Sequence, residues 1–400
     1  MSFVDTFNRL DAEAWLRRVD GTAVAEVNRV LASGQTGLSA FLALLSPAAG
    51  GMLEPLTRRS RQITQQRFGK VIRLFAPLYL SNECINNCQY CGFSRDNPIL
   101  RVTLDVGEVV REAQALVGQG FRNILLVAGE HPKFVSNGYL EKCIGALRES
   151  VPGVSLEVGP METPEYRDMV TAGAEGLVVY QETYDRAVYK TMHTAGPKKD
   201  FNWRLETPER AHDAGFRRLG IGALFGLADW RAEALALAAH TDYLLRHCWK
   251  AHITVAFPRL RPCAGEFQPL TILSDRALVQ LIAAFRIAFP DIGLVLSTRE
   301  PAHLRDGLIP LGVTLMSAGS HTEPGGYTGA GRENLHVTER GRIKSLEETG
   351  NVLPQSAGQS SGATGQFDIA DERDPAEVAA LIRRLGYEPV WKDWDAALSA

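Results

Sequence analysis

The chain has 400 residues, of which 45% are hydrophobic and 22% charged, and its formal net charge is −3. A chain of this length buries a large core, either as one α/β barrel or as two medium-sized domains. The charge provides no basic field for nucleic acid, and the sequence has neither an apolar run long enough to span a membrane nor the apolar core of a signal peptide. We therefore expect a cytoplasmic protein with no nucleic-acid or membrane partner.

The first 70 residues carry apolar side chains at helical spacing, which predicts an N-terminal helical extension over 1–70. From residue 71, apolar β-prone runs alternate with amphipathic helices. Strands are predicted at 71–80, 123–129, 154–160, 176–181, 218–225, 252–258, 293–298 and 312–318. Helices are predicted at 105–118, 137–149, 163–173, 183–192, 205–215, 228–247, 273–288, 299–309 and 375–386.

Eight β/α units predict a (β/α)8 barrel of the TIM type over 71–327, with a doubly wound sheet as the alternative. Residues 328–366 are rich in Gly, Ser and Gln, which favours a flexible insertion that is either a surface loop or a lid over the barrel mouth. Residues 367–400 predict a C-terminal helix and an aromatic tail that pack on the barrel.

Three of the six cysteines lie in "CINNCQYC" as Cys84, Cys88 and Cys91, directly after the first predicted strand. In a barrel this is the first βα loop, on the face where active sites are built. A closed structural zinc site needs four protein ligands. Three thiolates instead hold three irons of a [4Fe–4S] cluster and leave the fourth iron open. A structural metal scaffold is the alternative from outside the enzymes.

This spacing on a barrel, with Tyr90 before the last cysteine, resembles the radical S-adenosylmethionine (SAM) superfamily. The resemblance implies that Cys84, Cys88 and Cys91 bind one [4Fe–4S] cluster, and that the amino and carboxylate groups of SAM chelate its fourth iron. One electron from the reduced cluster then cleaves SAM to methionine and a 5′-deoxyadenosyl radical. Tyr90 would flank the adenine, with ordinary packing as the alternative.

Four further residues are expected to contact SAM. Gly129 and Glu130 end the second strand and resemble the superfamily's Gly-Gly-Glu motif, although Ala128 replaces its first glycine. Glu157, near the end of the third strand, would meet the SAM ribose hydroxyls or form an inward salt bridge. Glu182, after the fourth strand, would contact SAM or the substrate amine, or act as a helix N-terminal acid.

A closer resemblance extends over most of the chain. The segments "LLSPAAG", "RFGKVIRLFAPLYLSNECINNCQYCGF", "YQETY", "RLETPERAHDAGF", "GIGALFGL", "FPRLRP", "LSTRE", "MSAGSHTEPGGY" and "PVWKDWD" together resemble the 2-iminoacetate synthase family, the tyrosine lyases of thiazole (thiamine) biosynthesis. The resemblance implies cleavage of the Cα–Cβ bond of L-tyrosine to 2-iminoacetate and p-cresol, after the deoxyadenosyl radical has removed hydrogen from the amine. It also implies a thiazole synthase as complex partner and a flavodoxin or ferredoxin as electron donor.

A tyrosine substrate requires a cation for its carboxylate. Arg299, just after the seventh strand, suits bidentate capture, and Glu300, Ser317 and Ser320 are expected to complete the grip. The alternatives are an ion pair of Arg299 with Glu300 or Asp306, and backbone-bonded turn hydroxyls for the serines. The sequence does not choose the group that handles the phenol proton among its candidates, which are Tyr180, Tyr184, His131 and His321.

Two related activities remain as alternatives. The tyrosine lyase of [FeFe]-hydrogenase maturation carries a second cysteine motif near its C-terminus, whereas this chain has no cysteine after Cys263. A second iron–sulfur cluster in the C-terminal region therefore lacks its ligands. A lyase for tryptophan or another aromatic amino acid would have a similar pocket around Arg299, and the sequence leaves it open.

Overall fold

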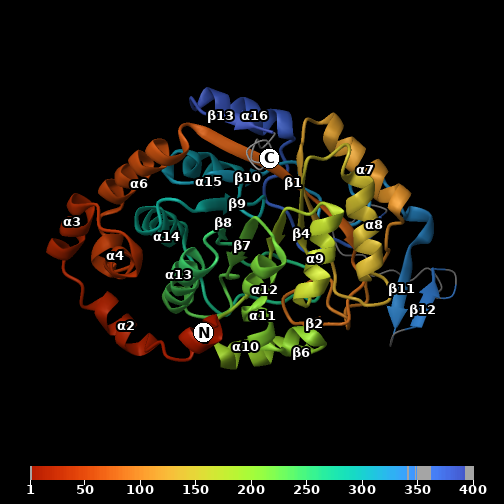
Figure 1. The fold of residues 1–400 in the computed structure, drawn as a ribbon, viewed down its shortest axis with the longest axis horizontal. Helices are drawn as coiled ribbons and strands as arrows, with labels where there is room; N and C mark the ends of the chain where they lie inside the picture. Colours follow the sequence, from red (N-terminus) through yellow and green to blue (C-terminus); the bar gives the residue numbers. More distant parts are fainter. Residues whose placement is uncertain (1, 340–341, 347, 349–361, 392–400) are drawn as a thin grey trace.

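The computed structural model describes residues 2–339, 342–346, 348 and 362–391. Its centre is a closed barrel of eight parallel strands (Figure 1). The strands are β1 (Val71–Ser81), β3 (Asn123–Ala128), β4 (Gly153–Glu157), β5 (Gly176–Val178), β7 (Arg218–Gly222), β8 (His252–Ala256), β9 (Gly293–Leu296) and β10 (Leu315–Ser317). Pairing of β1 with β10, from Arg73 opposite Leu315 to Phe75 opposite Ser317, closes the barrel. The predicted (β/α)8 fold is confirmed, and the doubly wound alternative is wrong because the sheet has no open break.

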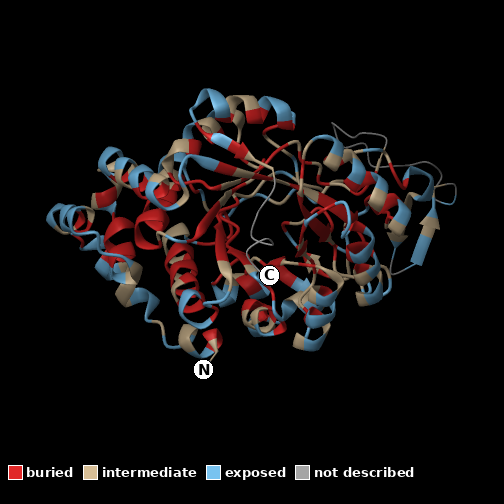
Figure 2. Ribbon diagram, turned by 45° about the horizontal axis from the view of Figure 1, so that its top comes forward, coloured by how far each residue is buried: buried red, intermediate tan, exposed pale blue. Residues whose placement is uncertain are grey.

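Apolar side chains dominate these strands and are almost wholly buried, as Figure 2 shows for the centre of the molecule. Most strands end a few residues earlier than the sequence predicts: β4 ends at Glu157 and β5 at Val178. The apolar run continues beyond the last strand pair because the loops at the barrel mouth are buried too. Apolar character alone therefore overestimates the length of a barrel strand.

Helices cover the outside of the barrel, close to where they are predicted. They are α7 (Val106–Gly118), α8 (Asn137–Leu147), α9 (Thr163–Ala172), α12 (Thr207–Ala214), α13 (Trp230–His247), α14 (Asp275–Ala288) and α15 (Ala302–Leu308). The connection from β5 to β7 is longer than the others and contains α10 (Arg186–Met192), the short strand β6 (His193–Ala195) and α11 (Phe201–Leu205) as well as α12.

The N-terminal extension is helical, as predicted. It consists of α1 (Phe3–Phe7), α2 (Ala12–Asp20), α3 (Val24–Ser33), α4 (Gly37–Leu44), α5 (Pro47–Gly50) and α6 (Leu53–Phe68). These helices lie along one side of the barrel, against α13 and α14 (Figure 1). Phe41 of α4 packs edge-on against Phe285 of α14, with ring centroids 4.7 Å apart. The extension thus shares the barrel's core.

The described residues of 328–366 contain structure that the sequence analysis did not expect. Strands β11 (His336–Glu339) and β12 (Arg342–Ser345) pair as an antiparallel hairpin. Residues 362–366 lead into a segment that crosses the barrel mouth. Residues 349–361, the centre of the predicted insertion, lie outside the described residues. The domain boundaries at 327 and 366 stay a prediction.

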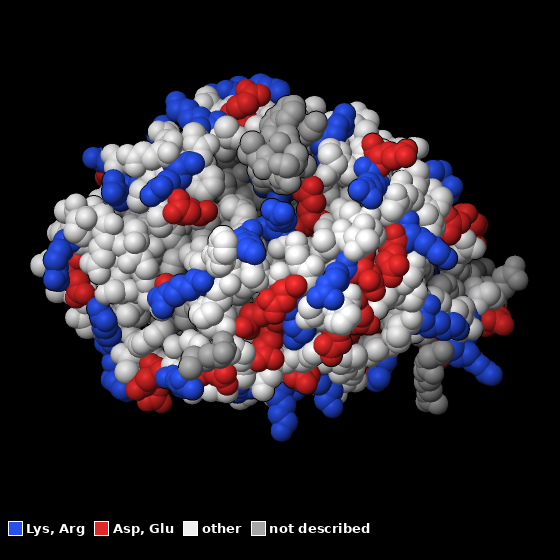
Figure 3. Space-filling view, viewed as in Figure 1, with Lys and Arg blue, Asp and Glu red and all other residues white. Residues whose placement is uncertain are grey.

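Helix α16 (Pro375–Arg384) confirms the predicted C-terminal helix, and β13 (Glu388–Val390) follows it as a parallel neighbour of β1. Trp391 then packs edge-on against Phe121, with centroids 5.1 Å apart. The rest of the predicted aromatic tail, residues 392–400, lies outside the described residues. None of the described helices combines the length and apolar character needed to cross a bilayer. Basic and acidic side chains are interspersed over the face drawn in Figure 3.

Candidate active site

The cysteine loop follows β1 at the carboxyl end of the barrel strands and is tied to the β5–β7 connection. Strand β2 (Asn87–Cys88) pairs antiparallel with β6, and the amide of Gln89 donates to the carbonyl of Met192 at 3.1 Å. The hydroxyl of buried Tyr90 lies 2.7 Å from Nε2 of His193. This loop is therefore fixed on both sides of Cys88.

Arg101, a wholly buried residue, holds the loop from the other side. Its guanidinium donates to the carbonyl of Ser94 at 2.8 Å and to that of Phe93 at 3.2 Å, among others. Several backbone carbonyls of the loop accept hydrogen bonds from this one cation, which fixes the part of the loop that follows Cys91. Next to Cys84, the buried carboxylate of Glu83 accepts hydrogen bonds from His336 and Thr338 of the β11–β12 hairpin, both at 2.7 Å.

The three cysteines of this loop are free thiols, Cys88 buried and the other two partly buried. Burial, and after it the neighbouring Cys91, raises the pKa of the Cys84 thiol, and burial raises that of Cys88. Buried thiols ionise only when a cation compensates the charge. Within the described residues no three His, Cys, Asp or Glu side chains are grouped to hold one ion. Three neighbouring thiols of this kind fit a polynuclear iron–sulfur cluster, whose irons are spaced apart.

Gly129 and Glu130 lie directly beneath the cysteine loop. A Cβ atom at Gly129 would stand 2.3 Å from the carbonyl oxygen of Glu83, so only glycine allows this approach. The carbonyl of Glu130 accepts from the amide of Ile85 at 2.8 Å, and its carboxylate accepts from the side chain of Asn86 at 2.6 Å. The end of β3 thus supports the loop that carries the cysteines.

Glu182 lies between two cations of the β5–β7 connection. Its carboxylate is 2.7 Å from Lys198 Nζ and 3.4 Å from Arg204 Nη2, and its φ of 71° is unusual for a residue with a side chain. Burial opposes its charge, but Lys198 and Arg204 outweigh burial and lower the pKa of Glu182. Lys198 Nζ also lies 5.6 Å from the centre of the Tyr90 ring. Glu182 therefore belongs to a buried charged cluster beside Cys88 rather than to a helix start.

A cavity opens inside the barrel mouth between these groups and the later strands. Its polar lining includes Glu157 from the end of β4, Arg299 from the loop after β9, and the phenols of Tyr79 and Tyr180. Burial, followed by the charge of Glu182, raises the pKa of Glu157 to about 7. The structure shows no ion pair of Glu157 with another described residue, so the inward salt bridge is not observed.

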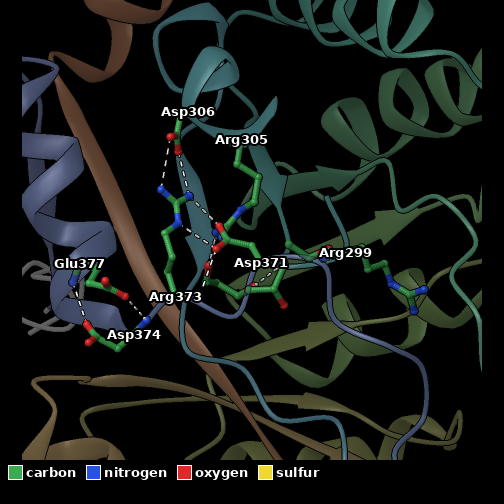
Figure 4. A network of polar contacts seen from close by, with 10 residues as sticks. Arg299, Arg305, Asp306, Asp371, Arg373, Asp374 and Glu377 are labelled. Atoms are coloured by element: carbon green, nitrogen blue, oxygen red, sulfur yellow. Dashed lines mark hydrogen bonds and ion pairs between the residues drawn. The ribbon is translucent and has the colours of Figure 1, made fainter. Parts of the chain in front are cut away.

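Arg299 points into this cavity and stacks on an aromatic ring. Its guanidinium carbon lies 3.4 Å from the centre of the Phe367 ring. Neither alternative ion pair forms within the described chain, because Glu300 is held by Arg259, with an Arg259 Nε to Glu300 Oε1 distance of 2.9 Å, and Asp306 pairs with Arg373. Figure 4 shows Arg299 directed away from Asp306 and its partners. Arg299 and Glu300 therefore have separate partners.

The two predicted serines differ. The hydroxyl of Ser317 accepts from the amide of Thr298 at 3.1 Å, which is the backbone-bonded alternative. The hydroxyl of Ser320 is buried, lines the cavity and has no partner within the described residues. Of the two, Ser320 has the free hydrogen-bonding capacity that a ligand can use.

Of the four candidates for the phenol proton, Tyr180 lines the cavity. The hydroxyl of Tyr184 instead lies 2.9 Å from Nδ1 of His240, a buried residue, and His321 is 3.1 Å from the carboxylate of Glu323. His131 packs against Phe134 near the hairpin, with ring centroids 4.7 Å apart.

Several residues of the site were missed in the sequence. They are Tyr79, Arg101, His193, Lys198, Arg204, Gln366 and Phe367. The basic residues of "KTMHTAGPKKDFNWR" are a usable signal, because they gather in the connection that follows Glu182 and can pair with its carboxylate. Nothing local distinguishes Gln366 or Phe367, which lie more than 250 positions from the cysteines.

Two family models match the chain. The radical SAM superfamily model matches residues 78–238, and the "Biotin and Thiamin Synthesis associated domain" model matches residues 256–388. The first match contains the cysteine loop and the β5–β7 connection. The second contains Arg299 and the segment with Gln366 and Phe367.

Two relatives align with the chain over almost its whole length. The chain is 42% identical to 2-iminoacetate synthase of Escherichia coli (strain K12) over 99% of its length and 98% of that protein, and 40% identical to that of Salmonella typhimurium over the same shares. Among solved structures, HydG, a maturase of the [FeFe]-hydrogenase, aligns with a TM-score of 0.84 at 29% identity, covering 97% of this chain and 81% of HydG.

Proposed function

Because the chain belongs to the 2-iminoacetate synthase family of radical SAM enzymes, we propose specific roles for the residues at its barrel mouth. The enzyme is a carbon–carbon lyase that cleaves the Cα–Cβ bond of L-tyrosine and uses one [4Fe–4S] cluster and SAM. It produces 2-iminoacetate, which supplies the glycine imine of the thiamine thiazole, and p-cresol. When bound, the cluster and SAM supply a 5′-deoxyadenosyl radical.

Cys84, Cys88 and Cys91 hold the cluster in this proposal. The support is chemical: three thiols lie in one loop that the β2–β6 pairing and Arg101 anchor. The anchoring keeps the loop in place before the cluster is loaded.

SAM is bound around this loop. Gly129 allows a close backbone approach, and Glu130 lies next to Cys84 and is suited to the amino group of SAM. Glu182 stays ionised between Lys198 and Arg204. These three side chains therefore offer charges of both signs to the zwitterionic end of SAM. Glu157 suits the ribose hydroxyls, and Tyr90, which His193 fixes, flanks the adenine.

The substrate carboxylate is bound by Arg299, with the free hydroxyl of Ser320 as a second donor. Ser317 and Glu300 position the surrounding loops, since their polar groups bind Thr298 and Arg259. The phenol extends towards Tyr79 and Tyr180. The clamp brings the amine, rather than the Cβ hydrogens, nearest the radical, and positioning of this kind is the protein's main contribution to such chemistry.

One observation carries these roles. The cavity lined by Arg299 and Ser320 is also lined by Gln366, whose side chain contacts Cys91. A carboxylate clamp and a cluster loop on one cavity are what a reaction between SAM and an amino acid requires.

Arg299→Lys tests the clamp. Lysine keeps the charge but loses the planar fork, so we expect at least about a tenfold loss of kcat/KM for tyrosine. Iron content and cluster absorbance after anaerobic reconstitution should stay unchanged. Arg61→Lys, an exposed position on α6, is the matched control and should behave as wild type. Equal kcat/KM values in the two variants would exclude Arg299 as the clamp.

The proposed partners follow from the reaction. Its product, 2-iminoacetate, is unstable in water, which favours direct transfer to a thiazole synthase. The cluster needs a low-potential donor such as a flavodoxin or ferredoxin. Turnover with a reduced flavodoxin in place of a chemical reductant, and retention of the thiazole synthase on the immobilised enzyme, test these two partners separately.

A further inference from the structure

The segment of residues 362–371, which we call the strap, crosses the mouth of the barrel. Its backbone makes hydrogen bonds to four different βα loops. They join Thr364 to Leu100, Gln366 to Thr322, Asp368 to Pro262 and Ala370 to Thr298, at 2.9–3.0 Å. These loops follow β8, β9, β10 and β1, which are neighbours in the barrel, so the bonds fix the strap over that part of the mouth.

Both ends of the strap are anchored in the interior. At one end, the side chain of Asn82 donates to the carbonyl of Thr364 at 3.0 Å. At the other, Asp371 forms a buried ion pair with Arg305 of α15 and a second one with Arg373 at 2.7 Å (Figure 4). Asp371 and Arg305 are 2% and 0% exposed, so this contact is part of the core.

The strap approaches the cysteine loop at Gly92, the residue after Cys91. The amide of Gly92 donates to the carbonyl of Gln366 at 3.0 Å. A Cβ atom at position 92 would stand 2.6 Å from that carbonyl oxygen, so a larger residue would push the strap away. The glycine of "CQYCGF" thus permits direct contact between strap and loop.

The side chain of Gln366 uses this approach to reach Cys91. Its Oε1 accepts from the hydroxyl of Tyr79 at 2.8 Å, and its Nε2 lies 3.8 Å from Cys91 Sγ. If the amide were reversed, its oxygen would face the sulfur. A thiolate at Cys91 would repel that oxygen, so the thiolate favours the orientation with Nε2 towards the sulfur. Burial, and next the carboxylate of Glu157, raises the pKa of Tyr79, so the phenol keeps the proton that it donates.

We propose that Gln366 is a positioning residue that acts through Cys91: its amide N–H hydrogen-bonds the cluster thiolate and makes the cluster easier to reduce. A donor to a cluster sulfur stabilises the more negative, reduced state, and it does so strongly in a buried place. Tyr79 holds the amide in the required orientation. The inference rests on the proposed role of Cys91 as a ligand.

The test is the midpoint potential of the cluster, measured by an EPR-monitored redox titration of the reconstituted enzyme without SAM or tyrosine. Gln366→Met keeps the side-chain length and removes the donor, so its potential should be more negative than that of wild type. Gln366→Glu should shift it further in the same direction, since a carboxylate faces the sulfur. Tyr79→Phe frees the amide to rotate and should give a smaller shift of the same sign.

Gln66→Glu is the control, because Gln66 is an exposed residue of α6, outside the loop that carries the cysteines. It adds the same charge as Gln366→Glu, and its potential should stay close to that of wild type. Each variant is compared at equal iron content and equal cluster absorbance. A potential of Gln366→Met equal to that of wild type would overturn the inference, and so would equal shifts in Gln66→Glu and Gln366→Glu.

Cys91→Ala tests separately whether Cys91 is a cluster ligand. If Cys91 is not a ligand, Cys91→Ala retains a full cluster on reconstitution. If it is a ligand but Gln366 does not act on it, Cys91→Ala loses the cluster while Gln366→Met keeps the wild-type potential.

Discussion

Arg299 is oriented by a residue of the strap, Phe367. Its guanidinium carbon lies over the ring of Phe367, 3.4 Å from the ring centre, and both residues line the cavity. Stacking uses the face of the guanidinium and leaves its edge, with the N–H donors, free for a carboxylate. Phe367 therefore orients Arg299, the residue that we propose as the carboxylate clamp.

We predict that Phe367→Leu raises KM for tyrosine by at least about fivefold, since a cation–π contact at such a site contributes about 1 kcal/mol or more. Phe367→Trp retains an aromatic face and should stay within a few-fold of wild type. Steady-state rates of p-cresol formation over a range of tyrosine concentrations measure this. A Phe367→Leu enzyme with unchanged KM would show that the stack has no role in binding.

Glu157 predicts a dependence of stability on pH. Its pKa is raised to about 7 in the folded protein, first by burial and then by Glu182, against about 4.3 in an unfolded chain. A carboxyl with a raised folded pKa favours folding at low pH, where it is protonated in both states, and this contribution is lost as the pH rises through 7.

For the apoprotein, Glu157→Gln should therefore raise the free energy of unfolding by up to about 3 kcal/mol at pH 8, and by much less at pH 5. Urea unfolding at pH 5, 6.5 and 8 gives the comparison. Glu149→Gln, at an exposed position, controls for the change in total charge. A Glu157→Gln effect that does not vary with pH would contradict the raised pKa.

At the scale of elements, the sequence predicts the strands, helices and loops that depend on residues close together along the chain. Eight apolar runs become eight barrel strands, and "CINNCQYC" lies on the expected loop because both follow from local pattern. The anchors of that loop were not predictable in the same way. His193 and Arg101 act through contacts made by the closed barrel. The sequence places Glu182 after the fourth strand, but it does not predict the contacts of Glu182 with Lys198 and Arg204.

Helix α1 is the most distant element that supports the site. Phe3 stacks on His240 with ring centroids 4.1 Å apart, and His240 in turn contacts the hydroxyl of Tyr184, two residues after Glu182. Phe7 packs against Phe201 at 5.7 Å, and Arg186 covers both of these rings. The N-terminal helix thus holds the β5–β7 connection, which carries Lys198 and Arg204.

Phe3→Ala should loosen this connection. We expect faster hydrogen exchange over residues 181–205 and SAM binding weakened by about tenfold, or 1.4 kcal/mol, with cluster content unchanged. Val24→Ala, at a residue of α3 that is 51% exposed, is the control. Wild-type exchange rates over 181–205 in Phe3→Ala would show that α1 covers the barrel without supporting the site.

At the scale of the whole molecule, segments from both ends of the chain complete the barrel. The N-terminal helices cover α13 and α14, β13 extends the sheet beside β1, and the strap lies on the loops that follow β8, β9, β10 and β1. The strap also accounts for two residues elsewhere in the chain. Gly92, directly after Cys91, leaves room for the strap backbone, and the buried Arg305 of α15 pairs with Asp371 of the strap. Neither fact has a local explanation in the sequence, since each concerns residues far apart along the chain.

The Arg305–Asp371 pair should therefore carry much of the strap's stability. Asp371→Asn leaves the buried guanidinium of Arg305 without a charged partner, and loss of one partner of a buried pair costs about 3–5 kcal/mol. We expect a lower free energy of unfolding and faster hydrogen exchange over residues 362–371. Arg373→Gln removes a partly exposed cation and leaves Asp371 paired with Arg305, so it should cost less than Asp371→Asn.

The double variant Arg305→Met/Asp371→Leu separates charge from packing. It replaces the ion pair with apolar side chains of similar size, so no unpaired charge stays buried and most of the stability should return. Its strap should exchange as slowly as that of wild type, and its cluster potential should match wild type because Gln366 is again in place. A double variant as unstable as Asp371→Asn would mean that the strap depends on the hydrogen bonds of this pair, including the one from Arg305 to the carbonyl of Ser317, rather than on the absence of an unpaired charge.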